Sequence, residues 1–266
     1  MKPSTRRPAR TPDYAPPLDR LLALGNPSGD ADRMWRNVPL ADYAAMGLSV
    51  DNADELIRLA SDPWFNVQQS PQCYAPIHAF RALAALGCTR AIPAMLRLVE
   101  KMDKANEDGW LEDVPGVLAV FGPAAIGPVA AAWRDQRTPF GARLFIGDAL
   151  ERIALKWSEH RSTVVGVFAE TLKLARYTDP GINGHAISSL VALNAVESLP
   201  AIRSVMEAGL ADETVCGNIK SVEQDIRLTA EERAAATRAM IDAIEADPNS
   251  PLNRLAAAFG QASVGE

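Results

Sequence analysis

A glycine or asparagine followed six residues later by a proline recurs along this chain at intervals close to 35 residues. The pairs are Gly87 with Pro93, Gly122 with Pro128, and Asn194 with Pro200. The first two pairs are 35 residues apart and the last two are 72 apart, which is two steps of 36. Each pair separates two apolar segments of helical length. The recurrence predicts an all-α chain of repeated helical hairpins.

The stretch 74–100 shows the hairpin most clearly. Its first segment places apolar residues on one helical face: Ala75, Ala79, Ala82, Leu83 and Leu86. Its second segment does the same with Ile92, Met95, Leu96 and Val99. Gly87 lies between the two segments and can adopt the left-handed conformation that ends a helix. Asn194 tolerates the same conformation. We expect each proline in the first turn of a second helix, where its missing N–H is not needed.

The remaining boundaries follow from composition and capping signals. We expect a disordered basic arm over 1–17 and capping helices over 18–72. The repeats cover 73–209, in units of about 73–105, 110–136, 140–176 and 182–209. The third unit lacks the glycine–proline pair, and its second helix is expected near Thr163. Capping helices over 210–266 complete the chain, with a capping box at Thr229 and Glu232.

The spacing and the turn motifs resemble HEAT-like repeats, in particular the short bacterial type named after phycobilisome lyases. The motifs are Leu86-Gly87…Ile92-Pro93, Phe121-Gly122…Gly127-Pro128 and Leu193-Asn194…Leu199-Pro200. The layout of 74–83, 110–128 and 182–197 is also similar to a bacterial family of HEAT-like proteins without an assigned activity. The resemblance implies an α-α superhelix, or α-solenoid, in which neighbouring hairpins share a continuous core.

The charge distribution argues against a nucleic-acid-binding body. The chain carries 27 basic and 33 acidic residues, a net charge of −6. Residues 1–20 contain five basic and two acidic residues, a net charge of +3, so the other 246 residues carry −9. Nucleic-acid binders present basic faces. The arm itself is interpreted either as a solubilising leader or as a contact for an acidic partner or nucleic acid.

The cysteines and the hydropathy indicate a cytoplasmic protein. Cys73, Cys88 and Cys216 are odd in number and lack metal-ligand spacing, so neither a disulfide framework nor a zinc site is expected. The N-terminus lacks the apolar run of a signal peptide, and no segment reaches the roughly 18 apolar residues of a membrane span. We expect no cofactor.

Catalytic signatures are absent from the sequence. His78, His160 and His185 form no local metal-ligand pair, and neither nucleophile elbows nor glycine-rich phosphate loops occur. The His-Glu pairs of HEAT-type iron hydroxylases are missing. Trp110, Trp133 and Asp135 are residue types that HEAT-type base-excision enzymes use, but no motif of those enzymes is present. Lyase-like activity is suggested by repeat type alone, and fold does not decide function.

The candidate partner-binding residues cluster around one tryptophan in the loop between the first two repeats. They are Trp110 with Glu107, Asp108, Glu112 and Asp113, together with Trp64 near the N-terminal cap. An aromatic anchor within an acidic rim can receive a basic peptide. The alternative is that the tryptophan fixes the two repeats together and the acids are solvated. We therefore expect a non-catalytic scaffold for a protein partner; a HEAT-type enzyme and a nucleic-acid binder remain as alternatives.

Overall fold

The computed structural model describes residues 13–27, 40–65, 68–105 and 111–247. These residues are helical or irregular and include no strand, which confirms the all-α class. The candidates Glu107, Asp108 and Trp110 lie outside the described residues, as does most of the expected arm.

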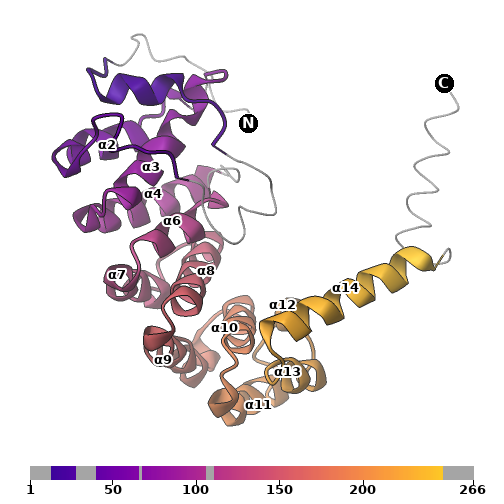
Figure 1. Cartoon of the computed structure of the whole chain (residues 1–266). Helices are drawn as coiled ribbons and strands as arrows, with labels where there is room; N and C mark the ends of the chain where they lie inside the picture. Colours follow the sequence, from indigo (N-terminus) through magenta and orange to yellow (C-terminus); the bar gives the residue numbers. More distant parts are fainter. Residues whose placement is uncertain (1–12, 28–39, 66–67, 106–110, 248–266) are drawn as a thin grey trace, which may run out of the picture.

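The helices pack in sequential pairs through the middle of the chain. The pairs are α3 (Ala75–Ala85) with α4 (Ile92–Ala105), α6 (Val114–Val120) with α7 (Pro123–Arg134), α8 (Phe140–Lys156) with α9 (Arg161–Lys173), and α10 (Pro180–Ala192) with α11 (Leu199–Glu207). The first helices α6, α8 and α10 contact one another in order, and so do the second helices α7, α9 and α11. Figure 1 shows these two rows side by side. The pairs overlap the four predicted repeat ranges.

Turns between paired helices use the residues that the sequence indicated. Gly87 has φ 66° and Asn194 has φ 52°, so both adopt the expected left-handed conformation. At Gly87 the chain closes a Schellman motif, in which Cys88 N–H donates to the Leu83 carbonyl and Gly87 N–H to that of Ala84. Ala195 and Asn194 repeat this pattern after α10. Short 3₁₀ helices, η5 (Thr89–Ala91) and η8 (Val196–Ser198), then lead into α4 and α11.

The second repeat departs from this scheme, and the expectation for Pro128 is wrong. Pro93 and Pro200 occupy the first turns of α4 and α11, but Pro128 lies inside α7. The reason is that α7 begins at Pro123, directly after Gly122, with no 3₁₀ turn between. Gly122 has φ 61° and ψ −141°, outside the Schellman geometry. Pro128 has no N–H to donate to the carbonyl of Ala124, four residues earlier. Because Ala124 is exposed, water can bind this carbonyl instead.

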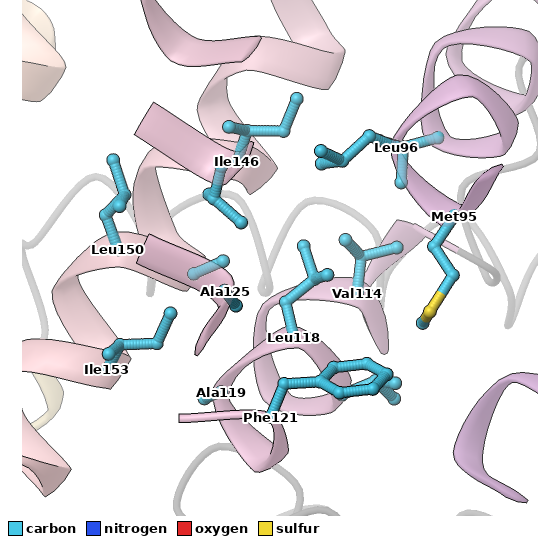
Figure 2. Packing of buried hydrophobic residues seen from close by; sticks show 14 of the residues in the cluster. Met95, Leu96, Val114, Leu118, Ala119, Phe121, Ala125, Ile146, Leu150 and Ile153 are labelled. Atoms are coloured by element: carbon cyan, nitrogen blue, oxygen red, sulfur yellow. The ribbon is translucent and has the colours of Figure 1, made fainter. Parts of the chain in front are cut away.

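The core runs continuously through the helix pairs. Figure 2 shows Met95 and Leu96 of α4 facing Val114 and Leu118 of α6, with Ile146 of α8 beside them. Buried residues from each pair pack against the next, because one hairpin cannot cover its own apolar face. This packing fixes the relative positions of α7, α8, α9 and α10, the helices that form the site described below.

The two ends of the helical array differ. The N-terminal part contains the 3₁₀ helices η1 (Leu18–Ala23), η2 (Val50–Asn52) and η4 (Gln72–Tyr74), with α2 (Ala53–Ala60). Residues 41–47, expected to form one of the capping helices, instead form turns over 43–47 that end at Gly47. Tyr14, within the range expected to be disordered, is buried, and its hydroxyl donates to Asp62 at 3.0 Å.

At the C-terminal end, α12 (Glu213–Cys216) and α13 (Ile219–Asp225) cover the last pair. Helix α14 (Ala230–Ala246) begins at the predicted capping box of Thr229 and Glu232. It is exposed along most of its length and extends away from the other helices (Figure 1). The expected final helix after Pro251 lies outside the described residues. No described helix has the length and hydropathy needed to cross a membrane.

Candidate functional site

Two adjoining pockets lie over the second helices of the last three pairs. The first has a volume of about 400 Å³ and is lined by residues of α7, α8 and α9 and the segments that follow α7 and α9. The second has a volume of about 330 Å³ and lies between the end of α9 and α11. Lys173, the last residue of α9, lines both. We call the two pockets together the α7–α9–α11 surface.

Two large apolar side chains are exposed on this surface where α9 ends. Leu174 is 56% exposed and lines the first pocket, and Tyr177 is 78% exposed and lines the second. The cause is local, because α9 stops at Lys173 and the 3₁₀ helix η7 (Ala175–Tyr177) follows. The tighter 3₁₀ winding shifts the side-chain register, so Ala175 is buried while its neighbours face water.

The surface is basic although the protein is acidic. Four basic residues and one acidic residue line the two pockets, a formal charge of 4 − 1 = +3: Arg134, Arg143, Lys173, Arg176 and Glu170. The whole chain carries −6. A positive area on a negative protein attracts acidic groups and repels basic ones.

Arg143 is the most unusual residue of the first pocket. It lies in the first turn of α8 and is only 7% exposed. Its Nε atom donates to the Trp133 carbonyl at 3.0 Å, and its guanidinium carbon lies 5.4 Å from the centre of the Trp133 ring. The Nη1 and Nη2 atoms form no hydrogen bond or ion pair with any described residue. Burial lowers the pKa of Arg143, while Asp179 and Asp135 oppose the change from a distance.

Both of these carboxylates are engaged elsewhere. Asp179 accepts a hydrogen bond from Gly181 N–H at 2.8 Å and caps α10. Asp135 pairs with Arg137 at 2.7 Å, and this contact lowers the pKa of Asp135 to about 2. Glu170, the acidic residue that lines the pocket, pairs with Arg134 at 2.6 Å. The charge of Arg143 is therefore only partly compensated.

Trp133 contacts Arg143 and Thr171, two of the residues that line this pocket. It is fully buried, and its Nε1 atom donates to Thr171 Oγ1 at 2.9 Å. The ring packs edge-on against Phe168, with 5.3 Å between centroids. A base-stacking role for Trp133 would need an accessible ring face, and this ring is enclosed. Its position fixes the carbonyl that holds Arg143.

A second polar cluster lies between α8 and α10, away from the pockets. His185 Nε2 lies 3.2 Å from Asp148 Oδ1 but without a hydrogen bond, and Ser189 lies one turn further along α10. Burial raises the pKa of Glu151 to about 7; the Ser189 hydroxyl opposes part of the rise and the Asp148 carboxylate adds to it. No described pocket opens at this cluster, so we assign it to helix packing.

Metal-binding and thiol chemistry find no support in the described part of the chain. No group of three His, Cys, Asp or Glu side chains there is arranged to hold a metal ion. Cys73, Cys88 and Cys216 are unpaired. Burial raises the pKa of the Cys88 and Cys216 thiols, which disfavours the reactive thiolate.

The residues predicted from sequence fall in three different environments. Asp113 is 6% exposed, and its carboxylate accepts two hydrogen bonds from buried Arg81, at 2.9 and 2.6 Å. Glu112 is exposed. Trp64 is half-buried and packs edge-on against Phe65 at 5.1 Å between centroids. Asp113 is thus paired inside the protein while its neighbour Glu112 faces water, and the role of the tryptophan-centred loop stays a prediction.

His78 and Arg81 hold the N-terminal segment in place. His78 Nδ1 lies 3.0 Å from the Tyr43 hydroxyl, and its Nε2 lies 2.9 Å from the Gly25 carbonyl. Arg81 Nη1 donates to the Pro27 carbonyl at 2.9 Å. Burial lowers the pKa of His78, so the neutral ring is favoured. These residues bind the chain's own backbone.

Sequence reasoning missed Arg143, but one signal was present. Arg143, Ile146, Leu150 and Ile153 are spaced by three, four and three residues, so the arginine falls on the apolar face of its helix. An arginine at such a position is either buried with a partner or lines a cavity. Leu174 and Tyr177 carried no comparable signal, because their exposure depends on where α9 ends.

No family model matches this chain, and the searches of curated proteins and of solved structures found no significant match either.

Proposed function

We propose that this protein is a non-catalytic binding scaffold, built as a HEAT-like α-solenoid, that recognises a protein partner through the α7–α9–α11 surface. The observation that carries the proposal is the pair of adjoining pockets over successive second helices, with Leu174 and Tyr177 exposed between them. In solenoid proteins, side chains from consecutive repeats form extended binding surfaces.

Contacts at a constant sequence separation support the repeat architecture. Arg134 pairs with Glu170 and Arg161 pairs with Glu197, and both pairs join residues 36 positions apart. Arg90 pairs with Asp54 over the same separation. This separation matches the spacing of 35 to 36 residues between the turn motifs, so residues in equivalent regions of neighbouring units meet. This regularity is expected of stacked hairpins.

The exposure of Leu174 and Tyr177 supports a role in binding rather than in stabilising the fold. Burying a large apolar side chain stabilises a protein by about 1.5–3 kcal/mol, so Leu174 and Tyr177 contribute little of this in the isolated chain. Tyrosine is enriched among the few interface residues that dominate binding energy. The neighbouring pockets give a partner's side chains somewhere to insert.

The test compares capture of a partner by matched variants. Tagged wild-type protein, Leu174→Ser, Tyr177→Ser and the control Leu155→Ser are each incubated with native lysate, and bound proteins are identified. Leu155 is a suitable control because it is 55% exposed, against 56% for Leu174, and lies on α8 outside both pockets. We expect one stoichiometric protein with the wild type and the control, reduced about tenfold or more with the two surface variants.

Other outcomes contradict the proposal. Equal capture by all four proteins would place the partner on another surface, including the loop around Trp110. Co-purifying nucleic acid or a bound small molecule in place of a protein would favour the nucleic-acid-binding or enzyme alternative.

The proposal includes the cytoplasmic location expected from the cysteine pattern, with which the three unpaired cysteines are consistent.

A further inference from the structure

We infer that the first pocket binds a carboxylate group of an acidic partner segment, and that Arg143 is the residue that receives it. This inference rests on the proposed function and deepens it by naming the chemistry of the partner. It comes from the place of Arg143 in the pocket: a buried guanidinium, held by one nitrogen, whose other two nitrogens have no partner among the described residues.

The first step concerns the orientation of Arg143. Its Nε atom is committed to the Trp133 carbonyl, and its planar group lies beside the Trp133 ring. Trp133 is itself fixed by its hydrogen bond to Thr171. A guanidinium fixed in this way keeps its free N–H groups in one direction before any ligand arrives. Preorganisation of this kind reduces the entropy lost on binding.

The second step concerns charge. Arg143 is only 7% exposed, and its Nη1 and Nη2 atoms open onto the pocket, where no acceptor from the described residues replaces the hydration that burial removes. Asp179 and Asp135 act on it only from a distance, and each has its own hydrogen-bond partner. Lys173, at the rim, forms no ion pair with any described residue. An anion entering this pocket therefore meets two incompletely compensated cations.

The third step concerns the kind of anion. The paired N–H groups of a guanidinium match the two oxygens of a carboxylate, and such pairs are about twice as strong as hydrogen bonds between neutral groups. Leu174 adds an apolar wall, which suits the methylene groups of a glutamate side chain. The pocket has a volume of about 400 Å³, which is large enough for one side chain with its adjoining backbone. A segment of a partner that carries acidic and apolar residues fits both the charge and the exposed leucine.

The experiment is an NMR titration of the full chain with acetyl-tetraglutamate-amide. Acetyl-tetraglutamine-amide is the neutral probe of the same shape, and inorganic phosphate is the alternative anion. We expect the glutamate probe to shift resonances of 134–143 and 170–178 and to bind about tenfold or more tightly than the glutamine probe. Arg143→Gln should abolish the shifts, Arg143→Lys should weaken binding about tenfold, and Arg97→Gln should change nothing, since Arg97 is exposed on α4.

A second variant, at an exposed position, keeps the test valid if Arg143→Gln fails to fold. Lys173 is exposed, so Lys173→Gln leaves the fold intact and should still weaken binding of the glutamate probe. Binding unaffected by Arg143→Lys and Lys173→Gln would overturn the inference, as would phosphate binding more tightly than the carboxylate probe. If capture of a protein partner still depends on Leu174 in that case, the proposed function stands and only the carboxylate assignment falls.

Discussion

Gly122 allows the packing of the second helix pair to be tested quantitatively, with Gly87 as the reference for a turn glycine that has no close neighbour. Both glycines end a first helix and have positive φ, 61° and 66°. A Cβ atom added at Gly87 meets nothing within 4 Å. A Cβ atom added at Gly122 lies 2.9 Å from both Cε2 and Nε1 of Trp157. Both positions have positive φ, but ψ is −141° at Gly122, close to a backbone region that essentially only glycine adopts. An alanine there meets more backbone strain than at Gly87, and the steric clash adds to it.

The expected magnitudes follow from these distances. An alanine with positive φ costs roughly 1–2 kcal/mol, so Gly87→Ala should lower the free energy of unfolding by that amount. The indole ring is rigid and must move as a unit, and overpacking of this kind costs about 1–3 kcal/mol. At Gly122 the backbone strain is of order 1–3 kcal/mol, so Gly122→Ala should lower the free energy of unfolding by about 2–6 kcal/mol in total.

Urea denaturation followed by circular dichroism measures both variants, and a double-mutant cycle isolates the clash. In the background of Trp157→Leu, the cost of Gly122→Ala should fall by about 1–3 kcal/mol, which is the coupling energy between residues 122 and 157; the backbone strain remains. Equal destabilisation by the two alanines, or a cost of Gly122→Ala that is unchanged without the indole, would refute the close approach of Trp157 to the turn.

Three further predictions address buried charge, titration and capping. Arg81→Met should lower the free energy of unfolding by about 3–5 kcal/mol by leaving Asp113 unpaired, and the double change with Asp113→Leu should recover most of it in urea denaturation. Glu151 has a folded-state pKa of about 7 against an ordinary 4.5, so the folded state binds more protons between these values and stability falls as pH rises through them. The loss is at most about 3 kcal/mol and should be smaller in Glu151→Gln when denaturation midpoints at acidic and mildly alkaline pH are compared. Thr229→Ala should speed hydrogen exchange over 230–246 while leaving the melting temperature nearly unchanged, because α14 is exposed along most of its length.

The parts of the fold that the sequence predicted are those decided by local chemistry. Gly87 and Asn194 end their helices in the left-handed conformation because few other residues adopt it readily. Thr229 caps α14 because its hydroxyl reaches the Glu232 N–H three residues on. Both effects act within a few residues, so a single sequence is sufficient to predict them.

The features that escaped prediction depend on contacts between repeats. Pro128 lies inside α7 because α7 begins at Pro123 without a 3₁₀ turn, and Trp157, which follows the last residue of α8, lies against Gly122 at this start. Asp113 was assigned to an acidic surface, but its carboxylate pairs with Arg81, 32 residues away. The α7–α9–α11 surface exists only when three hairpins are stacked, and no local pattern indicates which side chains remain exposed after stacking.

The central claim is that a protein partner binds over the ends of α7, α9 and α11. Hydrogen–deuterium exchange of the full chain, alone and with the captured partner, tests it most directly. The account predicts slower exchange on binding over 134–143, 170–178 and 201–210, with little change over 75–105. Protection confined to other regions, or no protection on the α7–α9–α11 surface at saturation, would contradict it.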